Sequence, residues 1–129
     1  MSEIHALIID DNSDNVGVLA QLLSMEGVSY TGVLDTRRLD AVLQKLARVD
    51  VIFLDLEMPN VDGYTLLQTI KSNPTLKTVP VVAYTVHVSE ISTARKLGFH
   101  SFLGKPLDAD RFPDHLARIL RGEGVWAVH

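Results

Sequence analysis

Residues 51–55 read Val-Ile-Phe-Leu-Asp, four apolar residues that run directly into a carboxylate. A run of this length is too short for a core helix, and its β-branched and aromatic residues favour a strand buried on both faces. Similar short runs lie at residues 6–9, 28–33, 81–84 and 102–103. The sequence therefore predicts five strands. Most of them lack the alternation of apolar and polar residues that is typical of a strand with one face exposed to solvent.

Between these runs, apolar residues recur at the i, i+3, i+4, i+7 spacing of amphipathic helices. The helical stripes span residues 16–23, 39–46, 64–70, 91–97 and 112–120. We expect Asn12 or Ser13 to cap the first helix and Asp108 the fifth. Strict alternation of strand and helix predicts an α/β fold: a doubly wound five-stranded parallel sheet, in the order 2-1-3-4-5, flanked by five helices.

Charge and composition exclude several classes of protein. The chain has 12 Lys and Arg against 16 Asp and Glu, a formal net charge of −4. Nonspecific nucleic-acid binding needs clustered basic residues, so this balance argues against it. The absence of cysteine excludes a disulfide framework, a thiolate metal site and a cysteine nucleophile.

The length of 129 residues fits a single domain. We expect this domain to span residues 1–121 and a short tail to span 122–129, with Trp126 of the tail packed back on the domain. No apolar run approaches the roughly 20 residues of a membrane span, and the first residues do not resemble a signal peptide. We therefore expect a cytoplasmic protein with no membrane partner.

Polar residues stand where the predicted strands end: Asp10 and Asp11 after the first, Asp55 after the third, Thr85 after the fourth and Lys105 after the fifth. Ligands of such sheets bind outside the carboxyl ends of the strands. Each residue alone has an ordinary alternative, as a helix cap, a loop start, a strand-end hydroxyl or a surface lysine. Their joint placement on four strand ends favours a site.

The chemistry of this set can be estimated. Two carboxylates about 4 Å apart repel by roughly 4 kcal/mol at an effective dielectric constant of 20. Three clustered acids therefore hold protons or bind a cation, and oxygen ligands of this kind suit Mg²⁺. A lysine and a threonine opposite the acids could grip a bridging phosphate, which indicates phosphoryl chemistry.

Taken in order, these motifs resemble the receiver domain of two-component response regulators, over residues 4–121. They are Leu-Ile-Ile-Asp10-Asp11-Asn, Ile-Phe-Leu-Asp55-Leu-Glu-Met-Pro59, Asp62-Gly63, Val-Pro-Val-Val-Ala-Tyr-Thr85 and Phe102-Leu-Gly-Lys105-Pro106. Each piece alone is weak, but the ordered set is specific. The resemblance implies a flavodoxin-like three-layer sandwich.

The resemblance also implies roles for the acids. Asp55 would accept a phosphoryl group from the phosphohistidine of a sensor histidine kinase or a histidine phosphotransfer protein. Asp11 and Asp55 would bind Mg²⁺ together with the backbone carbonyl of Glu57, and Asp10 would support the ion through water. The chain would be a phosphoacceptor signalling domain, with self-catalysed transfer and autodephosphorylation, rather than an enzyme with a separate substrate.

On the opposite side, Lys105 and Thr85 would contact the phosphoryl oxygens, and Phe102 would be the aromatic that swings inward with Thr85. The peptide before Pro106 would be cis, as is common in the family. Phosphorylation would switch the surface formed by strand 4, helix 4 and strand 5, to control a protein partner or to relay the phosphoryl group. A homodimer through helix 4, strand 5 and helix 5 is a further expectation.

Three features depart from the family pattern. Val86 stands where a small residue is usual, and it could narrow access to Asp55. The stretch from Thr85 to Lys105 is about two residues shorter than expected. Glu57 and His87 occupy positions whose side chains tune dephosphorylation in the family. We therefore expect Glu57, His87 and Val86 to set an unusual phosphoryl lifetime.

Two alternative functions remain open. A Mg²⁺-dependent aspartyl phosphatase of the haloacid-dehalogenase kind would need a second Asp, as general acid, at the position of Glu57. A receiver-like scaffold that is no longer phosphorylated would be consistent with Val86 and the short stretch, but the intact set of acids, Thr85 and Lys105 argues against it. A flavin site is disfavoured, because the acidic residues 10–12 would repel its phosphate.

Overall fold

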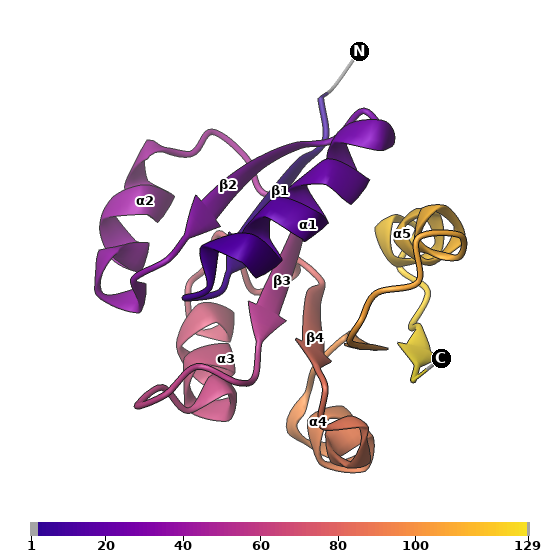
Figure 1. Cartoon of the computed structure of the whole chain (residues 1–129). Helices are drawn as coiled ribbons and strands as arrows, with labels where there is room; N and C mark the ends of the chain where they lie inside the picture. The colour runs from indigo at the N-terminus through magenta and orange to yellow at the C-terminus, as the bar shows by residue number, and fades with distance from the viewer. Residues whose placement is uncertain (1–2, 129) are drawn as a thin grey trace.

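The short apolar runs form the strands of one parallel sheet with helices on both faces (Figure 1). A computed structural model describes residues 3–128, so Met1, Ser2 and His129 of the predicted domain and tail lie outside the described residues. The strands are β1 His5–Ile9, β2 Ser29–Val33, β3 Val51–Asp55, β4 Val81–Thr85, β5 Ser101–Gly104 and β6 Trp126–Ala127. They pair in the order β2-β1-β3-β4-β5-β6, and every pair is parallel.

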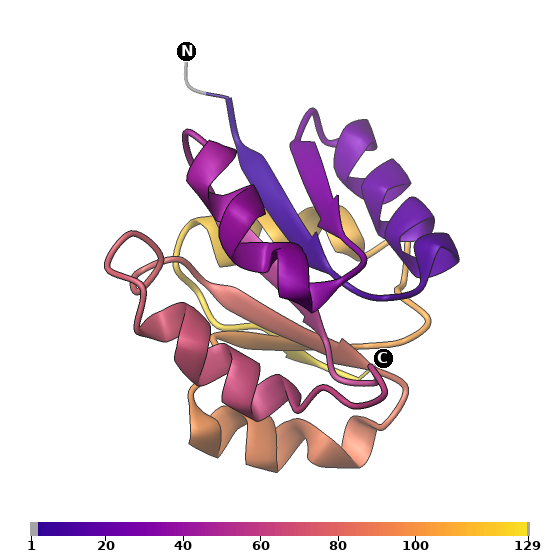
Figure 2. The same ribbon diagram turned by 90° about the vertical axis from the view of Figure 1, so that its left-hand side faces the viewer.

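Five α-helices cover the sheet, as predicted. They are α1 Ser13–Met25, α2 Leu39–Lys45, α3 Gly63–Lys71, α4 Ile91–Leu97 and α5 Phe112–Leu120, with 3-10 turns at η1 Thr36–Arg38 and η2 Val88–Glu90. Side chains of α1 and α5 build the core on one face, and those of α2, α3 and α4 build it on the other. Figure 2 shows α2 and α3 on the near side of the sheet and α4, in orange, below it. None of the helices in residues 3–128 has the length and apolar character to cross a membrane.

The central strands β1, β3 and β4 end at the edge of the sheet where the predicted site residues stand. Every residue of β3 and β4 is buried, as are residues 6–9 of β1. Each large apolar side chain buried in this way contributes roughly 1.5–3 kcal/mol. Because these strands are parallel neighbours, their carboxyl ends meet at one edge of the sheet.

The predicted strand count was wrong by one. Residues 126–127 add the sixth strand at the free edge of β5, with Trp126 opposite Phe102 and Ala127 opposite Leu103. The expected packing of Trp126 is confirmed, since its ring packs against the core and lies under the guanidinium of Arg95 at 4.9 Å. A two-residue strand has too little length to show a period, which is why the pattern did not reveal it.

Helix caps were predicted with mixed success. Asn12 caps α1, and its side chain accepts a hydrogen bond from the backbone N–H of Asn15. Asp108 does not cap α5. Its carboxylate instead accepts from the N–H groups of Asp110 and Arg111, and the helix begins only at Phe112. The acid therefore closes a turn that precedes the helix.

Candidate functional site

Three carboxylates gather at the edge where the central strands end. One carboxylate oxygen from each of Asp10, Asp11 and Asp55 can be chosen so that all three lie within 4.8 Å of one another. Asp10 and Asp55 are buried, whereas Asp11 is exposed. The sheet order thus brings together residues that lie 45 positions apart in the chain, because β1 and β3 are neighbours.

Lys105 is the cation of this cluster. It follows β5, and the Lys105–Pro106 peptide is cis, as the resemblance implied. Its Nζ donates a hydrogen bond to Asp55 Oδ1 at 2.9 Å and lies 4.0 Å from Asp10 Oδ2. Only 11% of the side chain is exposed, so both ion pairs are shielded from water. The predicted approach of Lys105 to the acids is therefore observed.

Burial and the neighbouring charge of Asp10 change the protonation of Asp55. Burial raises the pKa of Asp55 to about 6, and the negative charge of Asp10 acts in the same direction, while the hydrogen bond from Lys105 works against both. Three carboxylates with one ammonium leave surplus negative charge in a shielded place. All the side-chain donors are carboxylate oxygens, which a hard divalent cation such as Mg²⁺ prefers.

Tyr84 joins the site, although sequence reasoning gave it no role. Its hydroxyl donates to Asp10 Oδ2 at 2.6 Å, and Lys105 Nζ lies 4.6 Å from the centre of its ring. Burial, together with this hydrogen bond, raises the pKa of Tyr84 far above its ordinary value. The phenol therefore remains a donor. A tyrosine inside a buried strand needs a partner for its hydroxyl, and that was the available signal.

A second group of hydrogen bonds surrounds Thr85. Its hydroxyl donates to Glu57 Oε2 at 2.6 Å, and the N–H of Val86 donates to the same oxygen. The Thr85 hydroxyl also accepts the N–H of His87 at 3.0 Å. Burial works to raise the pKa of Glu57, but the hydrogen bonds from Thr85 and Val86 outweigh it and hold that pKa below its usual range.

The remaining predicted residues lie around these two groups. The backbone N–H of Glu57 donates to Asp55 Oδ1 at 3.0 Å, which joins the Thr85 group to the acids. Val86 is 52% exposed and His87 is also exposed. Phe102 is fully buried in the core on the face of α3 and α4. The stretch between Thr85 and Lys105 holds η2 and the seven residues of α4.

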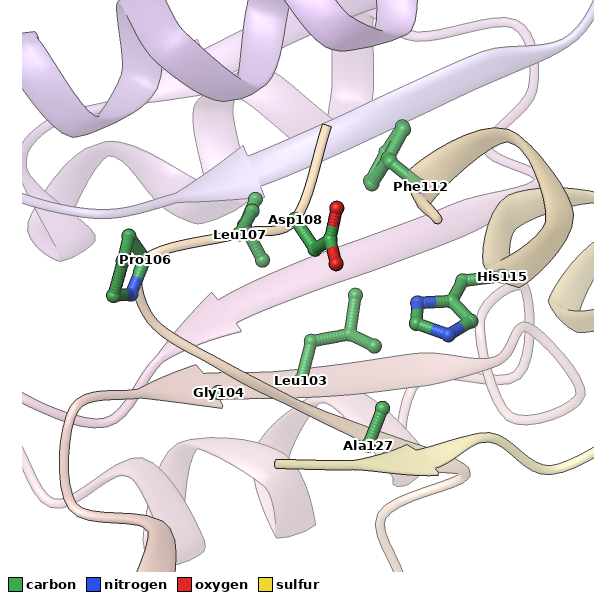
Figure 3. Close-up of a pocket in the computed structure, with 8 residues that line it drawn as sticks. All are labelled: Leu103, Gly104, Pro106, Leu107, Asp108, Phe112, His115 and Ala127. Atoms are coloured by element: carbon green, nitrogen blue, oxygen red, sulfur yellow. The ribbon is translucent and has the colours of Figure 1, made fainter. Parts of the chain in front are cut away.

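Besides a hollow lined by Asp11, Met58 and Pro59, two others border this region in the described part of the chain. One is a largely apolar depression on the surface, lined by Asn15, Val18, Tyr84, Val86, Lys105, Pro106 and Leu107. A separate cavity of about 20 Å³, between β5, α5 and β6, has room for roughly one water molecule. Figure 3 shows it walled by Leu103, Phe112, His115 and Ala127. None of the predicted site residues lines this second cavity.

Comparison with known proteins adds independent findings. The family model described as the response regulator receiver domain matches residues 6–117. The two-component response regulator ORR6 of Oryza sativa subsp. japonica is 34% identical over 110 residues, which are 82% of this chain and 65% of that protein. The signal transduction histidine-protein kinase BarA of Escherichia coli (strain K12) is 27% identical over 121 residues, 92% of this chain but 13% of the kinase.

Solved structures show the same fold. A two-component response regulator from Clostridium difficile superposes with a TM-score of 0.79 at 27% identity, and the match covers 92% of this chain and 97% of that chain. The chain spans less than two thirds of the length of ORR6 and a small part of BarA. The match therefore covers only part of each of these two proteins, and their complete functions involve segments outside it.

Proposed function

This chain belongs to the response regulator receiver domain family, and from that premise we propose that it accepts a phosphoryl group on Asp55 from a phosphohistidine. The observation that carries the proposal is the position of Asp55. Its carboxylate is buried at the end of a central strand, 2.9 Å from the Lys105 ammonium and beside two further acids. The donor would be a sensor histidine kinase or a histidine phosphotransfer protein.

The two carboxylate oxygens of Asp55 differ in their hydrogen bonds, and Oδ2 would be the nucleophile. Within residues 3–128, the hydrogen bonds that Asp55 accepts both end on Oδ1, from Lys105 and from the N–H of Glu57. Oδ2 would attack the phosphorus, so that an O–P bond forms while the P–N bond to the histidine breaks and its electron pair returns to the imidazole. A neutral imidazole leaves readily, so positioning and charge neutralisation supply most of the catalysis.

The donor set fits Mg²⁺, which Asp10, Asp11, Asp55 and the backbone carbonyl of Glu57 would hold. The ion, when bound, supplies charge neutralisation between the carboxylates and the phosphoryl oxygens. Lys105 would contact one of those oxygens. Tyr84 would hold the carboxylate of Asp10 in place through its hydroxyl.

The output of the switch would pass through Thr85 and Phe102 to the surface of β4, α4 and β5. Added phosphate charge of about −1.5 to −2 would draw the Thr85 hydroxyl to a new acceptor. A homodimer through α4, β5 and α5 would have to include β6, because β6 covers the edge of β5. The kind of output, a controlled partner or a phosphorelay, belongs to this proposal as well.

The deciding experiment is phosphorylation by a small phosphodonor. Incubation with Mg²⁺ and acetyl phosphate is expected to add about 80 Da, the mass of one phosphoryl group. Asp55→Asn should abolish this addition. Asp62→Asn, which retains a capping side chain at the start of α3, should leave it intact. Modification that persists in Asp55→Asn would contradict the assignment of the acceptor.

The same experiment separates the alternatives. Failure of modification, even with a cognate kinase, would favour the unphosphorylated scaffold. Steady release of phosphate from monoesters would favour the phosphatase. In the structure the Glu57 carboxylate accepts hydrogen bonds from Thr85 and Val86, which stabilise its ionised form, whereas a general acid must carry a proton. This contact weighs against Glu57 as a general acid.

We predict that Glu57, His87 and Val86 set the lifetime of the phosphoryl group. Glu57→Asn and His87→Ala should each change the decay rate by at least about threefold, which corresponds to roughly 0.7 kcal/mol in the barrier. Val86→Ala should speed decay, because a smaller side chain opens the path of water to Asp55. The measurement is loss of labelled phosphate at constant Mg²⁺, and equal rates in wild type, Glu57→Asn and His87→Ala would contradict it.

A further inference from the structure

The group around Thr85 has the composition of an anion-binding site. A hydroxyl, from Thr85, and a backbone N–H, from Val86, both donate to one oxygen of Glu57. A hydroxyl and a backbone N–H that converge on one oxygen in this way are typical of sites for carboxylate or phosphate oxygens. Here the anion is part of the chain itself.

The proposed function assigns one of these donors, the Thr85 hydroxyl, to another anion. Thr85 and Lys105 would contact the oxygens of a phosphoryl group on Asp55. Asp55 is the last residue of β3, and Glu57 lies two residues further on, in the loop that follows. We propose that the Glu57 carboxylate is a resident competitor: it occupies the donors of Thr85 and Val86 in the unphosphorylated protein and must leave when Asp55 is phosphorylated. This inference rests on the proposed function.

The competition follows from the number of protons available. A hydroxyl has one hydrogen, and so does a backbone N–H, so neither can serve the carboxylate and a phosphoryl oxygen fully at the same time. The Thr85 oxygen already accepts the N–H of His87, which orients its single hydrogen away from that bond and toward Glu57. The geometry therefore requires one anion to be exchanged for the other.

The structure also provides a way for Glu57 to leave. Its side chain is half-buried rather than enclosed, and its backbone is held independently by the hydrogen bond from its N–H to Asp55 Oδ1. The carboxylate can thus rotate toward water while the loop stays in place. A phosphoryl group that carries about −1.5 to −2 charge would repel it in that direction. Displacement of Glu57 would then accompany the movement of Thr85.

The first test measures affinity for a phosphoryl analogue. Beryllium trifluoride in the presence of Mg²⁺ is titrated into wild type, Glu57→Ala and Glu57→Gln, with binding followed by amide resonances. Removing the competitor should tighten binding about tenfold in Glu57→Ala, since charge-assisted hydrogen bonds no longer have to be broken. Glu57→Gln, which keeps an acceptor without its charge, should fall between the two.

Glu90→Gln is the matched control, because Glu90 also accepts a hydrogen bond from a hydroxyl, that of Tyr64 at 2.9 Å, but lies at the start of α4. The affinity of Glu90→Gln for beryllium trifluoride should equal that of wild type.

A second measurement needs no phosphorylation at all. In the unphosphorylated protein, Glu57→Ala should shift the amide resonance of Val86 upfield and speed its hydrogen exchange.

The two measurements together decide whether Glu57 competes with the phosphoryl group. A shifted Val86 amide together with tighter analogue binding supports the competition. An unchanged Val86 amide overturns the contact itself. A shifted amide with equal analogue binding by wild type and Glu57→Ala overturns the displacement but leaves the proposed function standing. A shifted amide with no binding by either folded protein overturns the displacement together with the proposed function.

Discussion

Asp55→Asn is expected to make the metal-free protein up to about 3 kcal/mol more stable at pH 8, although it removes the proposed phosphoacceptor. Burial raises the pKa of Asp55 to about 6 from its ordinary 3.8, with the charge of Asp10 acting in the same direction. Keeping this carboxylate ionised therefore costs free energy in the folded state. Asparagine has nearly the same shape and carries no such cost.

The sign of the effect gives it a characteristic pH profile. Because the folded state holds the proton of Asp55 more tightly than the unfolded state, this group stabilises the protein below about pH 4, and that stability is lost as the pH rises through about 6. Wild type and Asp55→Asn should therefore be similar near pH 4 and diverge up to pH 6. Above pH 7 the difference should stay constant.

The measurement is urea unfolding in EDTA at several pH values. Asp11→Asn is the control, because it removes the same charge from an exposed position of the cluster and should change stability by less than about 1 kcal/mol. If Asp55→Asn were no more stable than wild type at pH 8, the ion pair with Lys105 would fully offset the burial of Asp55.

Most of the fold could be predicted from short-range pattern. The run at residues 51–54 has no polar position, and such a strand requires cover on both faces, which leads to helices on both sides of a parallel sheet. The strand order 2-1-3-4-5 was confirmed for the first five strands. β6 was missed, and Asp108 was wrongly assigned as the cap of α5, because a two-residue strand and a turn before a helix carry no period.

The site was predictable in part, for a different reason. Asp10, Asp11, Asp55 and Lys105 converge because the topology brings strand ends together, and topology follows from pattern. The hydrogen bonds from Tyr84 to Asp10 and from Thr85 to Glu57 depend on side-chain rotamers and on the register of neighbouring strands. No spacing in the sequence encodes those quantities, so these contacts had to be observed.

Lys105→Met is expected to act in the opposite direction from Asp55→Asn. Methionine keeps much of the apolar stem of Lys105 but removes the only positive side chain paired with the carboxylates in the described part of the cluster. Removing one partner of a buried ion pair typically costs about 3–5 kcal/mol. The pKa of Asp55 should rise beyond about 6, because the hydrogen bond from Lys105 is the largest of the contributions that lower it.

The loss should therefore be larger at pH 8 than at pH 5, where Asp55 can take up a proton and escape the repulsion. Urea unfolding in EDTA at both pH values measures it. Lys71→Met is the control, since the Lys71 ammonium is exposed and donates only to the Gly98 carbonyl. Affinity for beryllium trifluoride should also fall at least about tenfold, as one charge-assisted hydrogen bond is lost.

The double variant Asp55→Asn/Lys105→Met tests the shared cause of the two effects. Once Asp55 is neutral, Lys105 retains only its 4.0 Å approach to Asp10 and its contact with the ring of Tyr84. Losing it then costs less, so the two changes should not add, and the coupling should reach about 1–3 kcal/mol. Additive effects, or a Lys105→Met variant as stable as wild type at pH 8, would mean that the surplus negative charge does not govern this site.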